Sequence, residues 1–177
     1  MLCATNWWGL DEFDVPSLVY MAVFNNTDFS IVPDRCQQGV LNFMVLTRLM
    51  TGGAFANDPA VIFNGKSVIN TTLVSYSTYY LSYITRHCTS LISLSLSLSP
   101  CDTDGNSQGG IMGGTFMSTT PDILSGVLGV PGAPFSLLLP RSQDFADFYD
   151  IFKIKYGNQL DRIFLLTFFQ QLWDRYA

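Results

Sequence analysis

The sequence has little charge and almost no histidine. Charged residues make up 13 % of the 177 residues, whereas 48 % are hydrophobic, and typical soluble domains carry about 25 % charged residues. Such a composition predicts a chain that associates through exposed apolar surface, or one that is part of a larger protein or assembly. The formal net charge of −5 and the lack of any Lys/Arg cluster exclude the usual electrostatics of nucleic-acid binding.

Patterns for metal binding and membrane crossing are missing as well. His87 is the single histidine, and the four cysteines show no C-x-x-C spacing, so neither a metal site nor a cofactor is expected. No apolar run reaches the about 18 residues that indicate a transmembrane helix. The first residues lack the basic start and apolar middle of a signal peptide, and no pattern indicates a cellular location.

Helical patterns are clear in two places. Apolar residues spaced by three and four predict a helix over 33–51, which starts with Pro33-Asp34 and ends before Gly52-Gly53. A second helix is expected over 159–176. The length of the chain fits one domain with a core of its own.

Strand patterns are shorter. Residues 1–9 and 123–131 are apolar runs that predict buried strands, and residues 17–24 fit either a strand or a helical turn. Turn residues at Asn64-Gly65 predict a small hairpin in which 61–63 pair with 67–69.

The most informative segment is residues 105–114, which read G-N-S-Q-G-G-I-M-G-G. It contains G-x-S-x-G, the pattern of a nucleophile elbow, in which a serine occupies a tight turn between a strand and a helix. Such a turn forces unusual backbone angles on Ser107, and Gly105 and Gly109 would keep the strand and the helix from colliding. The glycines that follow, Gly110 first, would let the helix pack closely on a sheet.

This segment resembles the α/β-hydrolase superfamily, and more narrowly a group of uncharacterised serine-hydrolase-like proteins. Further stretches share the resemblance: L-G-V-P-G at 128–132, L-L-P-R-S-x-D-F at 138–145, and residues 4–9, 38–43 and 57–59. It covers residues 1–73 and 105–177. Asn6 departs from the pattern, because that position is more commonly Asp in this fold.

The resemblance implies a partial α/β-hydrolase core with parallel strands and flanking helices, and a helical cap that begins over 140–177. It also implies acyl transfer on a small-molecule ester or amide. Ser107 would attack the carbonyl, while the backbone N–H of Gln108 would donate to one half of the oxyanion hole. The sequence does not indicate the substrate more closely, because caps and loops build the pockets that hold the acyl and alcohol groups.

The acid and the base of the triad are not found. In this fold both follow the serine, whereas His87 precedes Ser107 and no histidine comes after it. Five of the carboxylates that follow fall in the presumed cap, where solvated surface groups are expected; they are Asp144, Asp147, Asp150, Asp161 and Asp174. The sequence therefore predicts a single incomplete hydrolase domain over 1–177 that is inactive by itself.

Residues 74–103 fall outside the resemblance. They include a Leu/Ser repeat before Pro100, which is low-complexity sequence. Codons for Val74-Ser75 can form a splice donor, and codons for Thr103-Asp104 can contain a splice acceptor. A retained intron and a tyrosine-rich surface insertion both remain open as interpretations.

Three functions remain open. The chain is an active serine hydrolase with a base supplied by another chain, a non-catalytic truncated homologue, or an anion-binding module that uses the glycine-rich helix N-terminus. The last of these lacks the Gly-Lys-Ser/Thr of a P-loop and the G-x-G-x-x-G of a dinucleotide site.

Overall fold

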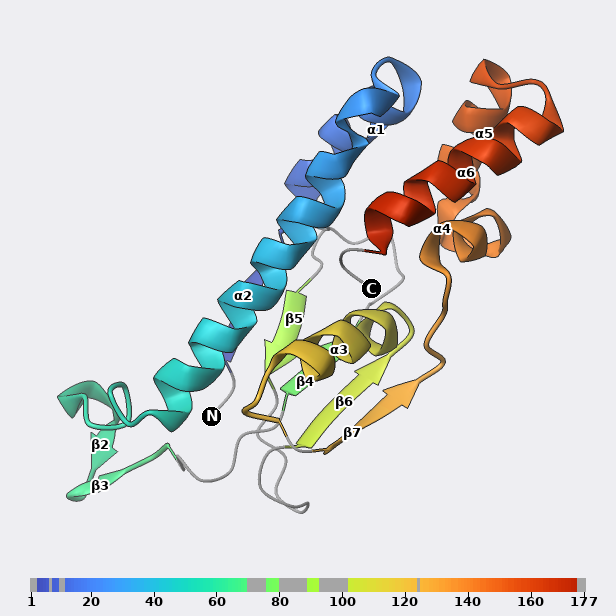
Figure 1. Cartoon of the computed structure of the whole chain (residues 1–177). Coiled ribbons are helices and arrows are strands. Elements are labelled where there is room, and N and C mark those ends of the chain that lie inside the picture. The colour runs from blue at the N-terminus through green and yellow to red at the C-terminus, as the bar shows by residue number, and fades with distance from the viewer. Residues whose placement is uncertain are drawn as a thin grey trace. The chain divides into compact units, whose positions relative to one another are not determined.

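The structure is a computed structural model that describes residues 3–6, 8–9, 12–69, 76–79, 89–92, 102–123 and 125–174. The helices in these ranges are α1 Val15–Val23, α2 Ile31–Thr51, α3 Gln108–Thr119, α4 Phe135–Leu138, α5 Ala146–Lys155 and α6 Gln159–Trp173 (Figure 1). The strands are β1 Cys3–Asn6, β2 Ile62–Phe63, β3 Lys66–Ser67, β4 Tyr76–Tyr79, β5 Thr89–Ile92, β6 Asp102–Asn106 and β7 Ser125–Gly129. Short 3-10 turns cover Glu12–Asp14, Asn26–Ser30, Pro59–Val61, Leu139–Arg141 and Gln143–Phe145.

These elements form two compact units. Unit 1 contains the strands β1 to β7, helix α3 and the part of α2 that begins at Gly39. Unit 2 contains α1, the part of α2 that ends at Gln38, and α4 to α6. The division between the units therefore falls inside α2.

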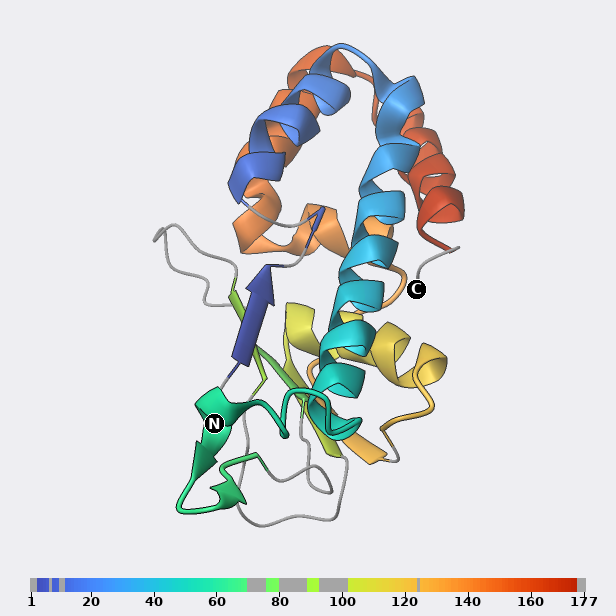
Figure 2. The same cartoon turned by 90° about the vertical axis from the view of Figure 1, so that its left-hand side faces the viewer.

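The predicted helix over 33–51 is confirmed as α2, and the predicted hairpin is confirmed as β2 and β3. Helix α2 ends where the Gly52 N–H donates to the Arg48 carbonyl at 2.7 Å. The hairpin pairs Ile62 with Ser67 in antiparallel register and follows α2 in the chain (Figure 2). Its turn residues Asn64 and Gly65 have φ values of 50° and 75°, as expected for the turn type that Asn-Gly favours.

The longer strands of unit 1 are described by their backbones. β6 runs parallel to β4 on one side and to β7 on the other. β1 pairs antiparallel with β5, with Cys3 opposite Ile92. Helix α3 packs against β4, β6 and β7 (Figure 1).

The prediction of a partial α/β-hydrolase core with parallel strands and flanking helices is wrong. Helix, with the 3-10 turns included, makes up 68 % of the residues whose backbone and side chains are both described, and six of these elements are α-helices. Within that set the one complete strand pair is the antiparallel hairpin β2–β3, with no parallel sheet. The parallel pairing of β6 with β4 and β7 lies outside it, because β4 and β6 are described by their backbones alone.

The composition of the strands explains this correction. Parallel sheets are covered on both faces and are built from apolar runs. β6 instead reads Asp-Thr-Asp-Gly-Asn, which consists mainly of residues that are depleted in strands. β7 was expected to be buried, yet the side chain of Val127 is 67 % exposed. An apolar run indicates that its residues favour a strand. It does not show that helices or another sheet cover that strand.

Unit 2 is held together by aromatic packing. The ring of Phe29 stacks on Phe169 with the centroids 4.1 Å apart, and Phe135 meets the buried Trp173 edge-on at 4.8 Å. The Ser136 N–H donates to the side-chain oxygen of Gln170 at 2.8 Å, which joins α4 to α6. These contacts bring together helices that lie far apart in the sequence.

Two further sequence expectations are settled in unit 2. Residues 17–23 belong to helix α1, and Phe24 is its C-cap; the helix accommodates Pro16 in its first turn, where proline needs no N–H donor. The helix expected over 159–176 is α6, whose first turn is capped by the Asn158 side chain accepting from the Leu160 N–H at 3.0 Å.

The interval 74–103 is only partly described. β4, β5 and the first two residues of β6 lie in it, whereas the Leu/Ser repeat from Ser93 to Pro100 lies outside the described residues. The retained intron and the surface insertion therefore both remain predictions.

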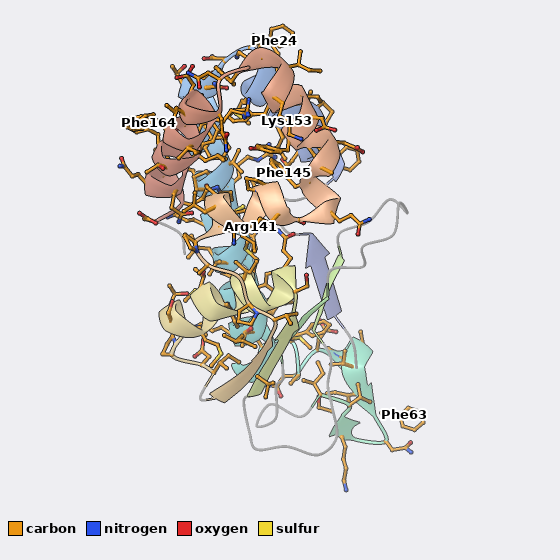
Figure 3. All side chains as sticks on the ribbon, turned by 90° about the vertical axis from the view of Figure 1, so that its right-hand side faces the viewer. Phe24, Phe63, Arg141, Phe145, Lys153 and Phe164 are labelled. Carbon is orange, nitrogen blue, oxygen red and sulfur yellow. The ribbon has the colours of Figure 1, made fainter. Side chains whose placement is uncertain are left out.

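Several large apolar side chains are exposed. Phe24 is 72 % exposed, and Phe63 on the hairpin is 70 % exposed. Figure 3 shows both of them, and Phe164 of α6, standing away from the ribbon. Association through such side chains stays a prediction.

Candidate active site at Ser107

Ser107 occupies the turn between strand β6 and helix α3. β6 ends at Asn106, and α3 begins at Gln108. Ser107 has φ 56° and ψ −121°, which lies outside the main allowed regions for an L-residue. Its side chain is exposed. The hydroxyl is therefore presented to solvent by a strained backbone.

Main-chain hydrogen bonds hold this conformation from both sides. The Ser107 N–H donates to the Gly129 carbonyl at 2.9 Å, which ties the turn to the end of β7. The Ser107 carbonyl accepts from the N–H of Gly110 at 2.9 Å and of Ile111 at 3.2 Å. A strained backbone conformation persists where several surrounding contacts fix it independently. The three hydrogen bonds of the Ser107 main chain provide such contacts.

The glycines of the segment allow α3 to approach β7. Gly109, Gly110 and Gly113 are buried in α3. A β-carbon added to Gly113 would lie 3.1 Å from a methyl group of Leu128 in β7, closer than ordinary contact. Gly105 lies in β6, where its backbone pairs with Leu128.

Helix α3 also supplies N–H groups near Ser107. The first N–H groups of any α-helix have no acceptor within the helix and carry a partial positive charge. Gln108 is the first residue of α3 and is half-buried. Its N–H therefore has no acceptor within α3.

A base for Ser107 is not identified. His87 lies outside the described residues. Five carboxylates after Ser107 have described side chains. Asp122 is half-buried and pairs with Arg48 at 2.9 Å, and the other four are exposed: Asp147, Asp150, Asp161 and Asp174. Asp150 accepts from Lys153 at 2.7 Å, and Asp174 accepts from Gln170 at 2.8 Å. Asp144 is described by its backbone alone.

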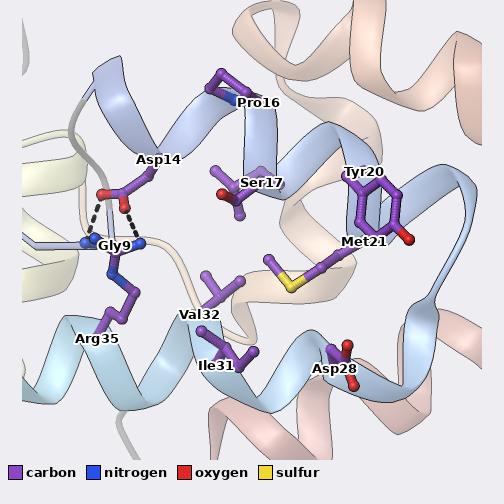
Figure 4. Close-up of a pocket in the computed structure, with 11 residues that line it drawn as sticks. Gly9, Asp14, Pro16, Ser17, Tyr20, Met21, Asp28, Ile31, Val32 and Arg35 are labelled. Atoms are coloured by element: carbon purple, nitrogen blue, oxygen red, sulfur yellow. Dashed lines mark hydrogen bonds and ion pairs between the residues drawn. The ribbon is translucent and has the colours of Figure 1, made fainter.

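A separate hollow of about 380 Å³ lies in unit 2 (Figure 4). Tyr20, Met21 and Val32 are among the residues that line it. At its wall the buried Asp14 accepts from the Gly9 N–H at 2.7 Å and pairs with Arg35 at 2.6 Å.

The sequence pattern missed two of these residues. The sequence gives no signal for the role of Asp14, because no spacing links it to Gly9 and Arg35. Val130 was read as part of a strand, yet it has φ 44° and follows β7. The Val130-Pro131-Gly132 run indicates a turn, and this was the available signal.

Comparisons of the chain with protein-family models, with curated proteins and with solved structures found no match. Within the described ranges, no three His, Cys, Asp or Glu side chains come together as metal ligands. None of the helices in the described part of the chain is long and apolar enough to cross a membrane.

Proposed function

We propose that Ser107 is the nucleophile of a serine hydrolase-type elbow and that its chemistry is acyl transfer from an ester or amide. The observation that carries the proposal is the strained backbone of Ser107, with φ 56° and ψ −121° at a strand-to-helix turn. Strain of this kind gathers at functional sites, where it aims a reacting group. The resemblance of residues 105–114 to serine hydrolases supports the same chemistry.

In the proposed reaction the Ser107 oxygen bonds to the carbonyl carbon of the substrate. The Gln108 N–H stabilises the charge that develops on the carbonyl oxygen. The alcohol or amine then leaves with the serine proton, and water later hydrolyses the acyl group from the serine. No histidine follows Ser107, and no acceptor for its proton is identified among the described residues, so slow acylation is expected.

Reactive phosphonates test the nucleophile directly. We expect a fluorophosphonate probe to label the folded protein at one site, slowly and stoichiometrically, because the oxyanion donor alone gives residual reactivity. Labelling is expected to fall to background in Ser107→Ala. Ser118→Ala is the matched control, since Ser118 is an exposed serine of α3, the helix that follows Ser107. A folded protein that is not labelled, or labelling that survives in Ser107→Ala, contradicts the proposal.

An added base tests the reason for slow reaction. We expect imidazole at high concentration to raise the labelling rate several-fold, because it accepts the serine proton as the O–P bond forms and fluoride leaves. The gain is smaller than the about 10²–10⁴-fold that a positioned base provides. His87→Ala should be labelled at the same rate as the unaltered protein. The time course of labelling, followed by mass spectrometry, measures this rate and the effect of imidazole. A loss of labelling in His87→Ala would identify His87 as the base.

An anion-binding role for the start of α3 is the second candidate. It is favoured by the N–H groups of the first helical turn. Calorimetry with inorganic phosphate separates the two roles, since binding without phosphonate labelling would favour the anion site.

A further inference from the structure

Three residues other than glycine have positive φ among those that the structure describes: Asn64, Ser107 and Val130. Asn64 is explained by the hairpin turn, and Ser107 by the elbow. Val130 begins a turn, but valine is not among the residues that a turn with positive φ favours. A β-branched side chain makes φ 44° a genuine outlier. The following Pro131 disfavours it further, because a residue before proline is restricted to extended conformations.

Val130 lies beside Ser107. Asn106 of β6 pairs with Gly129 of β7 in parallel register, so Ser107 and Val130 are the next residues on the two neighbouring strands. The hydrogen bond of 2.9 Å from the Ser107 N–H to the Gly129 carbonyl fixes this neighbourhood. Both residues directly follow the carboxyl ends of their strands.

Core packing does not account for the Val130 side chain, which is 74 % exposed. A strained and exposed apolar residue next to a nucleophile has a functional explanation. An acyl group attached to Ser107 carries an apolar chain that must lie against some nearby surface. Val130 offers an apolar surface one residue across from the attachment point.

We propose that Val130 is a specificity residue that contacts the acyl chain of the substrate on Ser107. This inference rests on the proposed function of Ser107. Apolar contacts of this kind discriminate chain length, since one methylene changes the rate by about 10–200-fold in an apolar pocket. The bulk of residue 130 thus sets which acyl chains react.

The test measures acylation of Ser107 by p-nitrophenyl acetate, butyrate and octanoate in the presence of imidazole, by mass spectrometry. We expect Val130→Phe to lower the octanoate-to-acetate rate ratio by about tenfold. Val130→Gly should change the same ratio and raise the melting temperature by a few degrees, because glycine adopts positive φ without strain.

Val127→Phe and Val127→Gly are the matched controls, because Val127 is an exposed valine inside β7, the strand that Val130 follows. They should leave the rate ratio unchanged, and Val127→Gly should lower the melting temperature. If Ser107 is acylated but the ratio stays within twofold in both Val130 variants, the specificity role is overturned while the proposed function stands. If no ester acylates Ser107 in the unaltered protein, both fail.

Discussion

Alanine in place of Gly9 is expected to lower the free energy of unfolding by about 3 kcal/mol, the sum of a positive-φ penalty and a steric clash. Gly9 is buried and has φ 92°. A β-carbon there would lie 2.8 Å from the Cys36 sulfur, 3.0 Å from the Cys36 nitrogen and 3.1 Å from the Val32 oxygen. Two of these three atoms belong to the backbone of α2, so a side-chain rotation cannot relieve the clash.

Gly65→Ala separates the two parts of this penalty. Gly65 has φ 75°, and no atom lies within 4 Å of an added β-carbon, so only the backbone term of about 1 kcal/mol applies. Urea unfolding followed by circular dichroism compares the two variants. Equal losses in Gly9→Ala and Gly65→Ala would show that the contact with α2 is absent in solution.

Removing the carboxylate of Asp14 has the second large effect. Asp14→Ala is expected to lower the free energy of unfolding by about 3 kcal/mol, because it leaves a buried N–H and a charged partner without an acceptor. The side chain of Asp14 is 3 % exposed and that of Arg35 is 42 % exposed. The pair is therefore only partly screened by water. Figure 4 shows that the same carboxylate meets both Gly9 and Arg35.

Asp14→Asn distinguishes the two bonds. Its amide oxygen can still accept from the Gly9 N–H, but it lacks the charge that pairs with Arg35, so a loss of about half the size is expected. Asp147→Ala is the control, since Asp147 is an exposed acidic residue of the same unit. Tryptophan fluorescence during urea unfolding measures all three, because Trp8 and Trp173 both belong to unit 2. An Asp14→Ala protein as stable as Asp147→Ala would contradict the proposed role of the carboxylate.

Local elements were predictable where one short pattern determines the structure. The spacing of apolar residues and the glycine pair at Gly52 determine α2, and Asn64-Gly65 determines the hairpin. The layers were not predictable, because burial depends on partners far along the chain. Val127 is of a residue type that is common in buried strands, yet its side chain is exposed. β1 pairs with β5, although more than eighty residues separate the two strands in the sequence.

The candidate site also divides into a part that a local pattern predicts and a part that depends on distant segments of the chain. G-x-S-x-G predicts the place of Ser107 and its unusual backbone, since small residues two positions to either side permit a tight turn. Val130 could not be assigned, because its place beside Ser107 depends on the register of β6 with β7. Asp14 could not be assigned either, because its contact with Gly9 depends on a loop conformation.

The way Ser107 is held has a consequence for how such a site changes in evolution. The hydrogen bonds that fix it run through its own N–H and carbonyl, and its partners are main-chain groups of Gly129, Gly110 and Ile111. None of them uses the hydroxyl. A single codon change could therefore remove the nucleophile while the turn keeps its shape, and another could restore it. Selection on the shape and selection on the chemistry act on different atoms of the same residue.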